Sequence, residues 1–575
     1  MTASTYPAPP TPQAVNISTF TPPPIDGSIS TPQMIDFHLA NNSAHPLFRF
    51  STADTFKPPF EDILWRDAGQ AIHRAARYAQ AHIGTPSDIT SAGSTKPPVI
   101  VVFAPAEFLH YSVFVYGVLR AGYVAHLISH RKSPAVLAHL FLKTDVTHVF
   151  VDESMRGLMN SVFHELQKEA NAIIPTVFDF PAFADLFVKD DSQFQALPAM
   201  KNAHLDSTAL IMNSSGSTSL PKAIYFTHRG LLEWSRSPWY GDRDLFRDVL
   251  GMQAAFPFYG AGYLYLASAF ASGCICAVRS PLGKSTAITP EGLLGEAVAT
   301  QATVVYSPPS LLEAWASNPS AITALSKFKI ILYGGAPLRE DVGSTLIASG
   351  VNISCSYAAT EVGTISKLLP DTQPADDWDH FELSPQASPY LKPVEGHPGV
   401  FELVIFSTPT HQLQVRNIEI DGKPAYATGD LLVKHPKNPE KYKIVGRVDD
   451  QLALSTGVKL NPLSVEVAIK ASPIVNGALI FGAGRPKLGI LIEPAEPIDS
   501  TNPDAVLDFR EAIWKTVDDA NAINGHIRIA KEMIITTNPA KPFLYTEKGS
   551  IRRSAVMKLY AEEIEGAYAT GGCFK

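Results

Sequence analysis

A run of small hydroxyl residues that ends in lysine is the segment of this sequence best suited to chemistry. It reads Asn213-Ser214-Ser215-Gly216-Ser217-Thr218-Ser219-Leu220-Pro221-Lys222 and follows the apolar run 209–212, which predicts a buried strand. Backbone N–H groups and hydroxyls in such a turn can surround an anion, and the lysine adds a positive charge. The Walker order G-x-x-x-x-G-K-[ST] is missing. The pattern favours a phosphate-binding loop over a flexible linker.

Strand and helix patterns alternate on both sides of this loop and indicate the elements that must position it. The β-branched run 99–103 predicts a buried strand, helical spacing follows over 105–119, and another strand is expected at 146–151. The same alternation returns within 303–332. Repeated spacing of this kind favours βαβ units on a parallel sheet.

The texture of the sequence changes beyond about residue 395, where β patterns with polar turns precede a short α+β pattern. We therefore expect an α/β fold. Its large N-terminal domain, 31–446, would combine parallel-sheet βαβ layers with a β-rich subdomain, and a small, mobile α+β C-terminal domain would cover 447–575. The Pro-rich tail 1–30 is expected to be disordered, and Thr31-Pro32 to begin the first helix with the threonine as its N-cap.

The composition limits the classes of partner that the protein can be expected to bind. Charged residues make up 18% of the 575 residues and the formal net charge is -8, which argues against a nucleic-acid partner. The sequence shows no N-terminal apolar leader and no apolar run long enough to span a bilayer, so we expect no membrane partner and a cytoplasmic protein. The four cysteines have no C-x-x-C spacing, which indicates neither a disulfide framework nor a zinc site.

Four further segments follow the serine-rich loop in order: 356–363 (SYAATEVG), 426–430 (YATGD), 446–450 (GRVDD) and 546–553 (TEKGSIRR). Together with the loop they resemble the adenylate-forming superfamily, which contains acyl-CoA synthetases, luciferases and the adenylation domains of nonribosomal peptide synthetases. The resemblance runs over about residues 33–562. It implies activation of a carboxylic acid with ATP and Mg²⁺.

Three more segments narrow the resemblance: 377–382 (DWDHFE), 454–462 (LSTGVKLNP) and 307–310 (SPPS). They are similar to the fungal synthetase-like carboxylic acid reductases, in which an adenylation domain precedes a carrier domain and a reductase domain. Because neither a carrier motif nor a dinucleotide-binding G-x-G-x-x-G follows before Lys575, we expect an excised first domain or a short relative. The implied partners are these two absent domains. Phosphopantetheine on the carrier would accept the acyl group, and NADPH would serve only the reductase domain.

The resemblance assigns most of the singled-out residues to Mg·ATP. The serine-rich loop would hold the β- and γ-phosphates, Thr360 would donate to the α-phosphate, and Glu361 would bind Mg²⁺, which prefers carboxylate oxygen. Asp430 would accept hydrogen bonds from the ribose hydroxyls, and Arg447 would reach ribose or phosphate. The implied nucleotide-binding residues are Ser214, Ser215, Gly216, Ser217, Thr218, Lys222, Gly335, Ala336, Tyr357, Ala358, Asp430 and Arg447.

The C-terminal segments carry two further expectations. Asp449 falls where the superfamily has its hinge. Lys548 is expected to be the catalytic lysine, acting with Thr360 and Glu361, although it precedes a glycine that it usually follows in the superfamily. Arg552 and Lys541 remain alternatives.

The substrate pocket is inferred from a missing charge. Amino-acid-activating relatives carry an aspartate early in the segment after the phosphate loop, and Tyr259 falls at or beside that place. A substrate ammonium would be left unpaired there, so we expect an aryl or similar carboxylic acid that lacks an α-amino group. A core role is an equal alternative for the other aromatic residues. The expected pocket residues are Phe258, Tyr259, Tyr263, Gly335 and Ala359.

We therefore expect an adenylation enzyme that makes an acyl-adenylate and passes the acyl group to a carrier thiol. A free-standing aryl- or acyl-CoA ligase is the first alternative. A non-catalytic adenylate- or acid-binding module is the second, suggested by Ser219 and Ala223 at positions where the superfamily has glycine.

Overall fold

The computed structural model describes residues 9–569 except 53–59, 87–95, 106, 170–171, 190–193, 201–204, 215–219, 283–287, 371–373, 396, 449–451, 456–458, 461, 486, 522–527 and 547–550. The chain divides into two compact units. Unit 1 comprises 1–215, 220–389 and 405–426, and unit 2 comprises 216–219, 390–404 and 427–575. The domain boundary expected at 446 therefore lies within unit 2 and stays a prediction.

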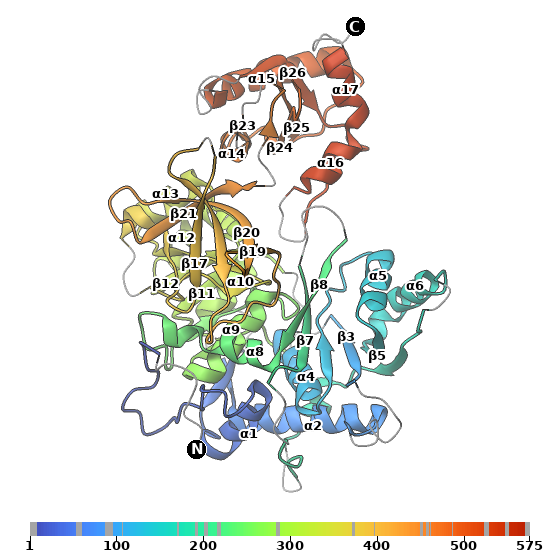
Figure 1. The fold of residues 1–575 in the computed structure, drawn as a ribbon, viewed down its shortest axis with the longest axis vertical. Helices are drawn as coiled ribbons and strands as arrows, with labels where there is room; N and C mark the ends of the chain where they lie inside the picture. Colours follow the sequence, from blue (N-terminus) through green and yellow to red (C-terminus); the bar gives the residue numbers. More distant parts are fainter. Residues whose placement is uncertain are drawn as a thin grey trace. The chain divides into compact units, whose positions relative to one another are not determined.

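Unit 1 contains a six-stranded sheet that carries both ends of the serine-rich loop (Figure 1). The strand order is β6-β5-β3-β4-β7-β8, with β8 antiparallel to β7 and the other pairs parallel. Ile100 and Val102 on β3 belong to one core cluster with helices α2 and α4, and Val101 and Phe103 to another with α5 and α6. This burial on both faces explains the continuous apolar run that predicted the strand. The bounds are β3 Val99–Phe103, β4 Val124–His126, β5 Val146–Val151, β6 Thr176–Asp179, β7 Thr208–Ser214, β8 Lys222–Thr227, α2 Trp65–Ile83, α4 Phe108–Arg120, α5 Pro134–Lys143 and α6 Arg156–Leu166.

A second, seven-stranded sheet of unit 1 has the order β13-β12-β11-β9-β10-β1-β2. Neighbouring strands are parallel except β1 and β2, which are antiparallel. The parallel βαβ layers expected from the sequence are thus present. The bounds are β1 Pro46–Ser51, β2 Phe60–Leu64, β9 Val249–Gly251, β10 Ile275–Ala277, β11 Val304–Ser307, β12 Ile330–Gly334 and β13 Ile353–Ser356.

The other elements of unit 1 include helices and the short strands β14, β15 and β16. Strands β14 and β15 form the small hairpin that carries Thr360 and Glu361. The bounds are α1 Thr31–Asn41, α7 Phe183–Leu186, α8 His228–Ser235, α9 Gly260–Ser272, α10 Pro290–Ala299, α11 Pro309–Ala316, α12 Pro319–Leu325, α13 Glu340–Ala348, β14 Ala358–Ala359, β15 Gly363–Thr364 and β16 Phe381–Glu382.

The N-terminal segment corrects the expectation of disorder. From residue 9 onward it packs on unit 1, where the buried Gln13 side chain donates to Pro238 O (3.1 Å) and accepts from Leu245 N (2.8 Å). Phe20 is 2% exposed and packs on His45, with 4.7 Å between ring centroids. A proline-rich composition lowers the number of backbone hydrogen-bond donors and so suggests disorder. It gives no information about distant residues that can bind the segment. Residues 1–8 lie outside the described part.

The first helix begins as expected at residue 31, but its N-cap is Ser30 rather than Thr31. The Gln33 side chain accepts a hydrogen bond from Ser30 N (2.8 Å), as in a capping box. The sequence predicted the helix start to within one residue.

Unit 2 holds the β-rich segment and the C-terminal α+β layer. Strands β21-β20-β18-β17 lie in one sheet, and β24-β25-β26 form another against which α14 and α15 pack (Figure 1). The α+β pattern expected beyond residue 450 is present. The bounds are β17 Ser388–Pro393, β18 Val400–Phe406, β20 Lys423–Lys434, β21 Lys441–Arg447, β22 Leu452–Ala453, β23 Lys459–Leu460, β24 Val475–Phe481, β25 Leu488–Pro494, β26 Ile529–Thr536, α14 Leu463–Lys470, α15 Pro503–Asn521, α16 Arg553–Leu559 and α17 Ala561–Ala569. Strand β19, Ile418–Ile420, belongs to unit 1.

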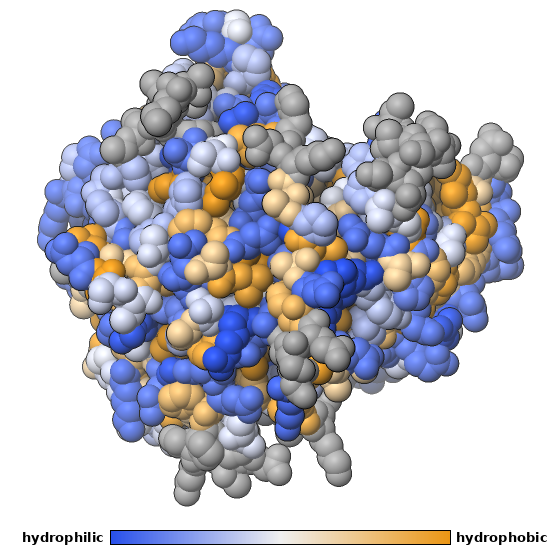
Figure 2. Space-filling model, turned by 90° about the horizontal axis from the view of Figure 1, so that it is seen from below, coloured by the Kyte–Doolittle hydropathy of each residue, from blue (hydrophilic) through white to orange (hydrophobic). Residues whose placement is uncertain are grey.

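Among the described residues, every helix is too short or too polar to cross a membrane. Figure 2 shows apolar and hydrophilic residues interspersed over the face that it presents.

Candidate active site

The ends of two parallel strands bring together the first group of predicted site residues. Gly334 at the end of β12 pairs with Ser356 at the end of β13, so Gly335 and Tyr357 leave the sheet side by side. A Cβ on Gly334 would lie 2.4 Å from Ser356 O, and Gly335 has φ +86°, so this turn requires glycine at both positions. The ring of Tyr357 is buried and packs on Phe381 at 5.3 Å.

The hairpin β14–β15 presents the second group. Ala358 pairs with Thr364 and Ala359 with Gly363, which leaves Thr360, Glu361 and Val362 as the connecting turn. Thr360 and Glu361 are half-buried. In the part of the chain that the structure describes, the Glu361 carboxylate has no hydrogen-bond or ion-pair partner, so its oxygen atoms are open to a ligand.

Helix α9 begins beside this turn. A Cβ on Gly260, the first residue of α9, would lie 3.5 Å from Thr360 Oγ1 and 3.5 Å from the Trp234 ring. Tyr259 is the N-cap residue of α9 and is half-buried, so the structure brings it close to the Thr360 turn. A helix N-terminus at this place favours negative charge.

Two other expected pocket residues lie deeper than Tyr259. Phe258 is 7% exposed and packs edge-on against Tyr259 at 4.9 Å. Tyr263 is 3% exposed and stacks on Tyr116 at 5.5 Å in the core. Burial raises the pKa of the Tyr263 hydroxyl. Both residues belong to the main core cluster of unit 1, which agrees with the core alternative for them.

The middle of the serine-rich loop, residues 215–219, lies outside the described residues. Its ends are fixed, because Ser214 and Lys222 are opposite each other at the end of the β7–β8 ladder, and Lys222 is exposed. The predicted residues Ser215, Gly216, Ser217 and Thr218 fall in the part that is not described, as do Asp449 and Lys548 in unit 2.

Sequence reasoning missed Trp234 on α8. Its ring packs on Phe226 of β8 at 4.9 Å, and its Nε1 would lie 2.4 Å from a Cβ on Gly363, whose φ is +86°. Trp234 therefore joins the strand that ends the serine-rich loop to the hairpin that carries Glu361. The available signal was a tryptophan within the segment 228–235 (HRGLLEWS), which follows the loop and has both apolar and charged residues.

Helix α8 begins at His228, and Thr227 is its N-cap, with Thr227 Oγ1 accepting from Gly230 N at 3.1 Å. His228 is buried and burial lowers its pKa to about 4. It follows the cap residue and does not cap the helix itself.

Unit 2 holds its own pair of predicted residues. Asp430 on β20 is opposite Arg447 on β21, and Arg447 Nη1 donates to Asp430 Oδ1 at 2.6 Å. Arg447 Nη2 donates to Thr428 O at 3.2 Å, and Asp430 N donates to Thr428 Oγ1 at 3.0 Å. The carboxylate expected to meet ribose is thus oriented before any ligand is present.

One alternative to Lys548 already has a partner. Lys541 Nζ contacts Glu563 Oε1 at 2.7 Å, and this hydrogen bond raises the lysine pKa. Arg552 is exposed next to the undescribed segment 547–550. The ion pair joins Lys541 to the first turn of α17.

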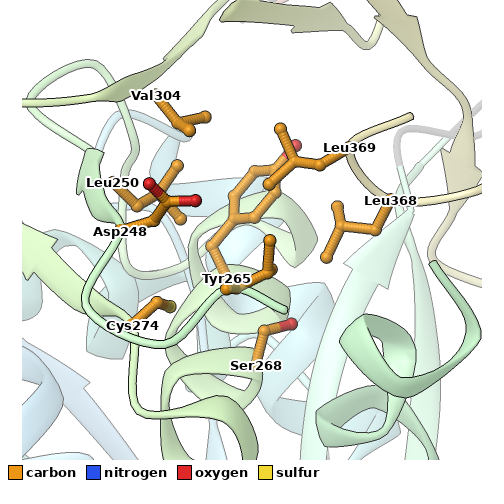
Figure 3. A pocket seen from close by; sticks show the side chains of 9 residues that line it. Asp248, Leu250, Tyr265, Ser268, Cys274, Val304, Leu368 and Leu369 are labelled. Carbon is orange, nitrogen blue, oxygen red and sulfur yellow. The ribbon is translucent and has the colours of Figure 1, made fainter. Parts of the chain in front are cut away.

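A cavity in unit 1 lies apart from these groups. Figure 3 shows Leu368 and Leu369 facing Tyr265 of α9 across it. Asp248 in its lining is bound by Lys329 Nζ at 2.7 Å and by Thr303 Oγ1 at 3.0 Å. Because none of the described residues that line the cavity is a predicted site residue and the Asp248 carboxylate is satisfied, the cavity is not the site described above.

Residues 89–398 match the family model described as AMP-binding enzyme, and residues 449–571 match the one described as AMP-binding enzyme C-terminal domain. The adenylate-forming reductase Nps10 of Heterobasidion annosum is 36% identical over 570 residues, which cover 98% of this chain and 52% of that protein. The chain spans about half the length of the curated relatives it matches.

Solved structures share the fold. The anthranilate CoA ligase AuaEII in complex with anthranoyl-AMP aligns with a TM-score of 0.67 at 16% identity, covering 94% of this chain and 98% of that chain. The A-PCP didomain of carboxylic acid reductase from Segniliparus rugosus in complex with AMP aligns with a TM-score of 0.65 at 17% identity, covering 94% and 82%. The expected α/β fold with a large N-terminal and a small C-terminal domain is confirmed.

Proposed function

The chain belongs to the AMP-binding enzyme family, and from this premise we propose that it converts a carboxylic acid and ATP into an acyl-adenylate and pyrophosphate. The observation that carries the proposal is the Thr360–Glu361 turn. The Thr360 hydroxyl lies beside Gly260 at the start of α9, and the Glu361 carboxylate is unengaged among the described residues. A carboxylate oxygen of the substrate would attack the α-phosphorus while pyrophosphate leaves, so charge neutralisation is the main task of the site.

The residues present fit Mg²⁺. A single open carboxylate is the usual protein contribution where the metal keeps several waters and takes its other ligands from phosphates. Within the described ranges no group of three or more metal-ligating side chains gathers, which agrees with a site completed by the nucleotide. When bound, Mg²⁺ would neutralise charge on the triphosphate. Glu361 would hold it, and Thr360 would donate its hydroxyl to the α-phosphate.

The other nucleotide contacts follow from the same assignment. Lys222 and the serine-rich loop would hold the β- and γ-phosphates. Tyr357 would lie beside adenine with the backbone of the Gly335 turn. Asp430 would accept from the ribose hydroxyls, with Arg447 beside it.

The proposed substrate is an aryl or similar carboxylic acid that lacks an α-amino group. Tyr259 offers an aromatic ring and a hydroxyl at the start of α9, where an ammonium would find no charge partner on that residue. Phe258 supports Tyr259 from the core side. Ala359 and Gly335 add little bulk, which leaves room for a planar group.

The proposed acyl acceptor is a phosphopantetheine thiol on a carrier domain, as the resemblance to the fungal synthetase-like carboxylic acid reductases implies. The small C-terminal domain would rotate about Asp449 between the two half-reactions, and Lys548 would assist adenylation. Free CoA is the second candidate acceptor, favoured by the likeness to the anthranilate CoA ligase.

A pyrophosphate-exchange assay over a panel of aryl, aliphatic and amino acids tests the proposal. We expect exchange with aryl acids, and about 100-fold less with the matching α-amino acids because their ammonium is unpaired. Thioester formation is then compared between free CoA and a pantetheinylated carrier domain. Exchange with none of the acids contradicts adenylation, and a faster reaction with CoA replaces the carrier by CoA.

A further inference from the structure

Helix α8 carries a buried carboxylate that the proposed chemistry does not use. Glu233 is 2% exposed, and its Oε2 accepts a hydrogen bond from Gln412 N at 2.7 Å. Its Oε1 is buried without a hydrogen-bond partner among the described residues. A half-satisfied buried carboxylate is costly, so an apolar residue would serve better if packing were its only role.

The partner of Glu233 lies in residues 408–415, here called the strap. The strap is folded on itself, because Thr408 N donates to His411 O at 2.9 Å and His411 N donates to Thr408 O at 3.2 Å. Gln386 adds a second tie to α8, since its Nε2 donates to Glu233 O at 3.2 Å and to Thr410 O at 2.8 Å. The strap is therefore anchored to α8 through the Glu233 side chain and main chain.

The other edge of the strap holds the turn that carries Glu361. Gln414 N and Val415 N both donate to Glu361 O, at 3.0 and 3.2 Å. His411 Nε2 donates to Val362 O. The strap thus engages two of the three carbonyl groups of this turn, and all of these residues belong to unit 1.

From this continuous chain of contacts, we propose that Glu233 is a positioning residue for Glu361, acting through the strap. The inference rests on the proposed function, in which Glu361 binds the metal. Glu233 does not touch the nucleotide or the metal. It fixes Gln412, the strap fixes the main chain of the turn, and the turn fixes where the Glu361 carboxylate can meet Mg·ATP. Groups that orient a metal ligand in this way typically contribute about 10- to 100-fold to metal affinity or activity.

The test compares Glu233→Ala with Glu233→Gln. In Glu233→Ala we expect the apparent KM for Mg²⁺ to rise and kcat of pyrophosphate exchange to fall, each by about tenfold, while the KM for the acid changes less than about twofold. Glu233→Gln keeps an acceptor for Gln412 N and should restore both values to within about threefold of wild type. A KM for Mg²⁺ in Glu233→Ala equal to that of wild type would overturn the proposal.

Glu296→Ala is the matched control. Glu296 is also a largely buried carboxylate with a raised pKa, but its partner is Arg279 and it lies on α10. We expect this variant to lose stability without a change in the Mg²⁺ dependence. An equal rise of the KM for Mg²⁺ in Glu296→Ala would show a general effect of destabilisation and would overturn the assignment to Glu233.

Hydrogen–deuterium exchange separates failure of this inference from failure of the proposed function. In Glu233→Ala the amides of Gln412, Gln414 and Val415 should exchange at least about tenfold faster, while those of α9 stay as protected as in wild type. If exchange changes in this way but the wild type is active with no acid, the positioning role of Glu233 is supported and the adenylation proposal is contradicted. Unchanged exchange of the strap amides would overturn the positioning role of Glu233, whatever the pyrophosphate-exchange activity.

Discussion

Two carboxylates that we assign to the same nucleotide are supported in opposite ways. Glu361 in unit 1 is held by its main chain, whose carbonyl accepts two hydrogen bonds from the strap, and its side chain is open in the described structure. Asp430 in unit 2 is held by its side chain, which accepts from Arg447 at 2.6 Å. One site fixes the backbone and frees the carboxylate, and the other fixes the carboxylate itself.

The difference matches what each group has to do. A metal ligand must take up and release Mg·ATP in every turnover, so a strong partner in the empty state would compete with the metal. A group that accepts hydrogen bonds from ribose hydroxyls gains from being oriented in advance, because the ordering cost is then met before binding. Position is provided by the strap in the first case and by Arg447 in the second.

Removing each carboxylate in turn is the strongest test of this comparison. We expect Glu361→Ala to lower kcat/KM for pyrophosphate exchange about 1000-fold, or about 4 kcal/mol, because metal-borne charge neutralisation is lost. Asp430→Ala should cost about 30-fold and act mainly through the KM for ATP. Steady-state kinetics with varied Mg²⁺ and ATP measures both. An Mg²⁺ dependence that is the same in Glu361→Ala as in wild type would remove the metal assignment.

The support of the first carboxylate also depends on pH. Burial raises the pKa of Glu233 to about 7 from an ordinary 4.5, and Asp206 adds to this, while the hydrogen bond from Gln412 N and the charges of Arg236 and Arg229 oppose it. Between pH 4.5 and pH 7 the folded state therefore keeps a proton that the unfolded state releases. The free energy of unfolding contributed by this group falls as the pH rises through that window.

Glu233→Gln should remove this slope. We expect the wild type to lose up to about 3 kcal/mol relative to the variant between pH 4.5 and 7.5, since each pKa unit is worth about 1.4 kcal/mol. Urea unfolding followed by tryptophan fluorescence across the pH range measures the difference. Burial lowers the pKa values of His411 and His228, which are common to both proteins and cancel in the comparison. Parallel stability curves for the two proteins would contradict the prediction.

Local pattern was enough to find the residues that meet the nucleotide in our assignment, and it was not enough to find what holds them. Thr360 and Glu361 stand in one contiguous motif, and the structure places both in the turn of one short hairpin. Glu233 and Gln412 are 179 positions apart, and the hydrogen bond between them follows no period along the chain. Long-range pairing of this kind depends on tertiary packing and leaves no local signal.

The N-terminal segment shows the same limit from the other side. Its composition predicted disorder, but Gln13 finds its partners on a segment more than 200 residues away. The sheets were predictable because parallel strands buried on both faces read as apolar runs, as at 99–103. Residues whose hydrogen-bond partners lie far away in the sequence show no comparable local pattern.

Arg447→Ala sharpens the comparison from the side of unit 2. Without the guanidinium, the Asp430 carboxylate keeps its place in β20 but loses the 2.6 Å hydrogen bond that orients it. Because the Arg447 side chain is 40% exposed, the ion pair contributes little to stability. We expect the free energy of unfolding to fall by about 0.5 kcal/mol. The KM for ATP should rise about tenfold. Thermal unfolding and ATP titrations separate the two effects, and a large loss of stability with unchanged KM would reverse the role given to Arg447.

The smallest expected effect tests whether main-chain support matters for the second carboxylate. Thr428 Oγ1 accepts from Asp430 N at 3.0 Å and donates to Leu403 O at 2.9 Å, so Thr428→Val removes both bonds with little change of shape. We expect a loss of about 1 kcal/mol in stability and a KM for ATP within about threefold of wild type, because Arg447 still orients the carboxylate. A rise in KM as large as that of Arg447→Ala would mean that Asp430, like Glu361, is positioned through its backbone. Both carboxylates would then be positioned through the main chain, and only the residues that hold the main chain would differ.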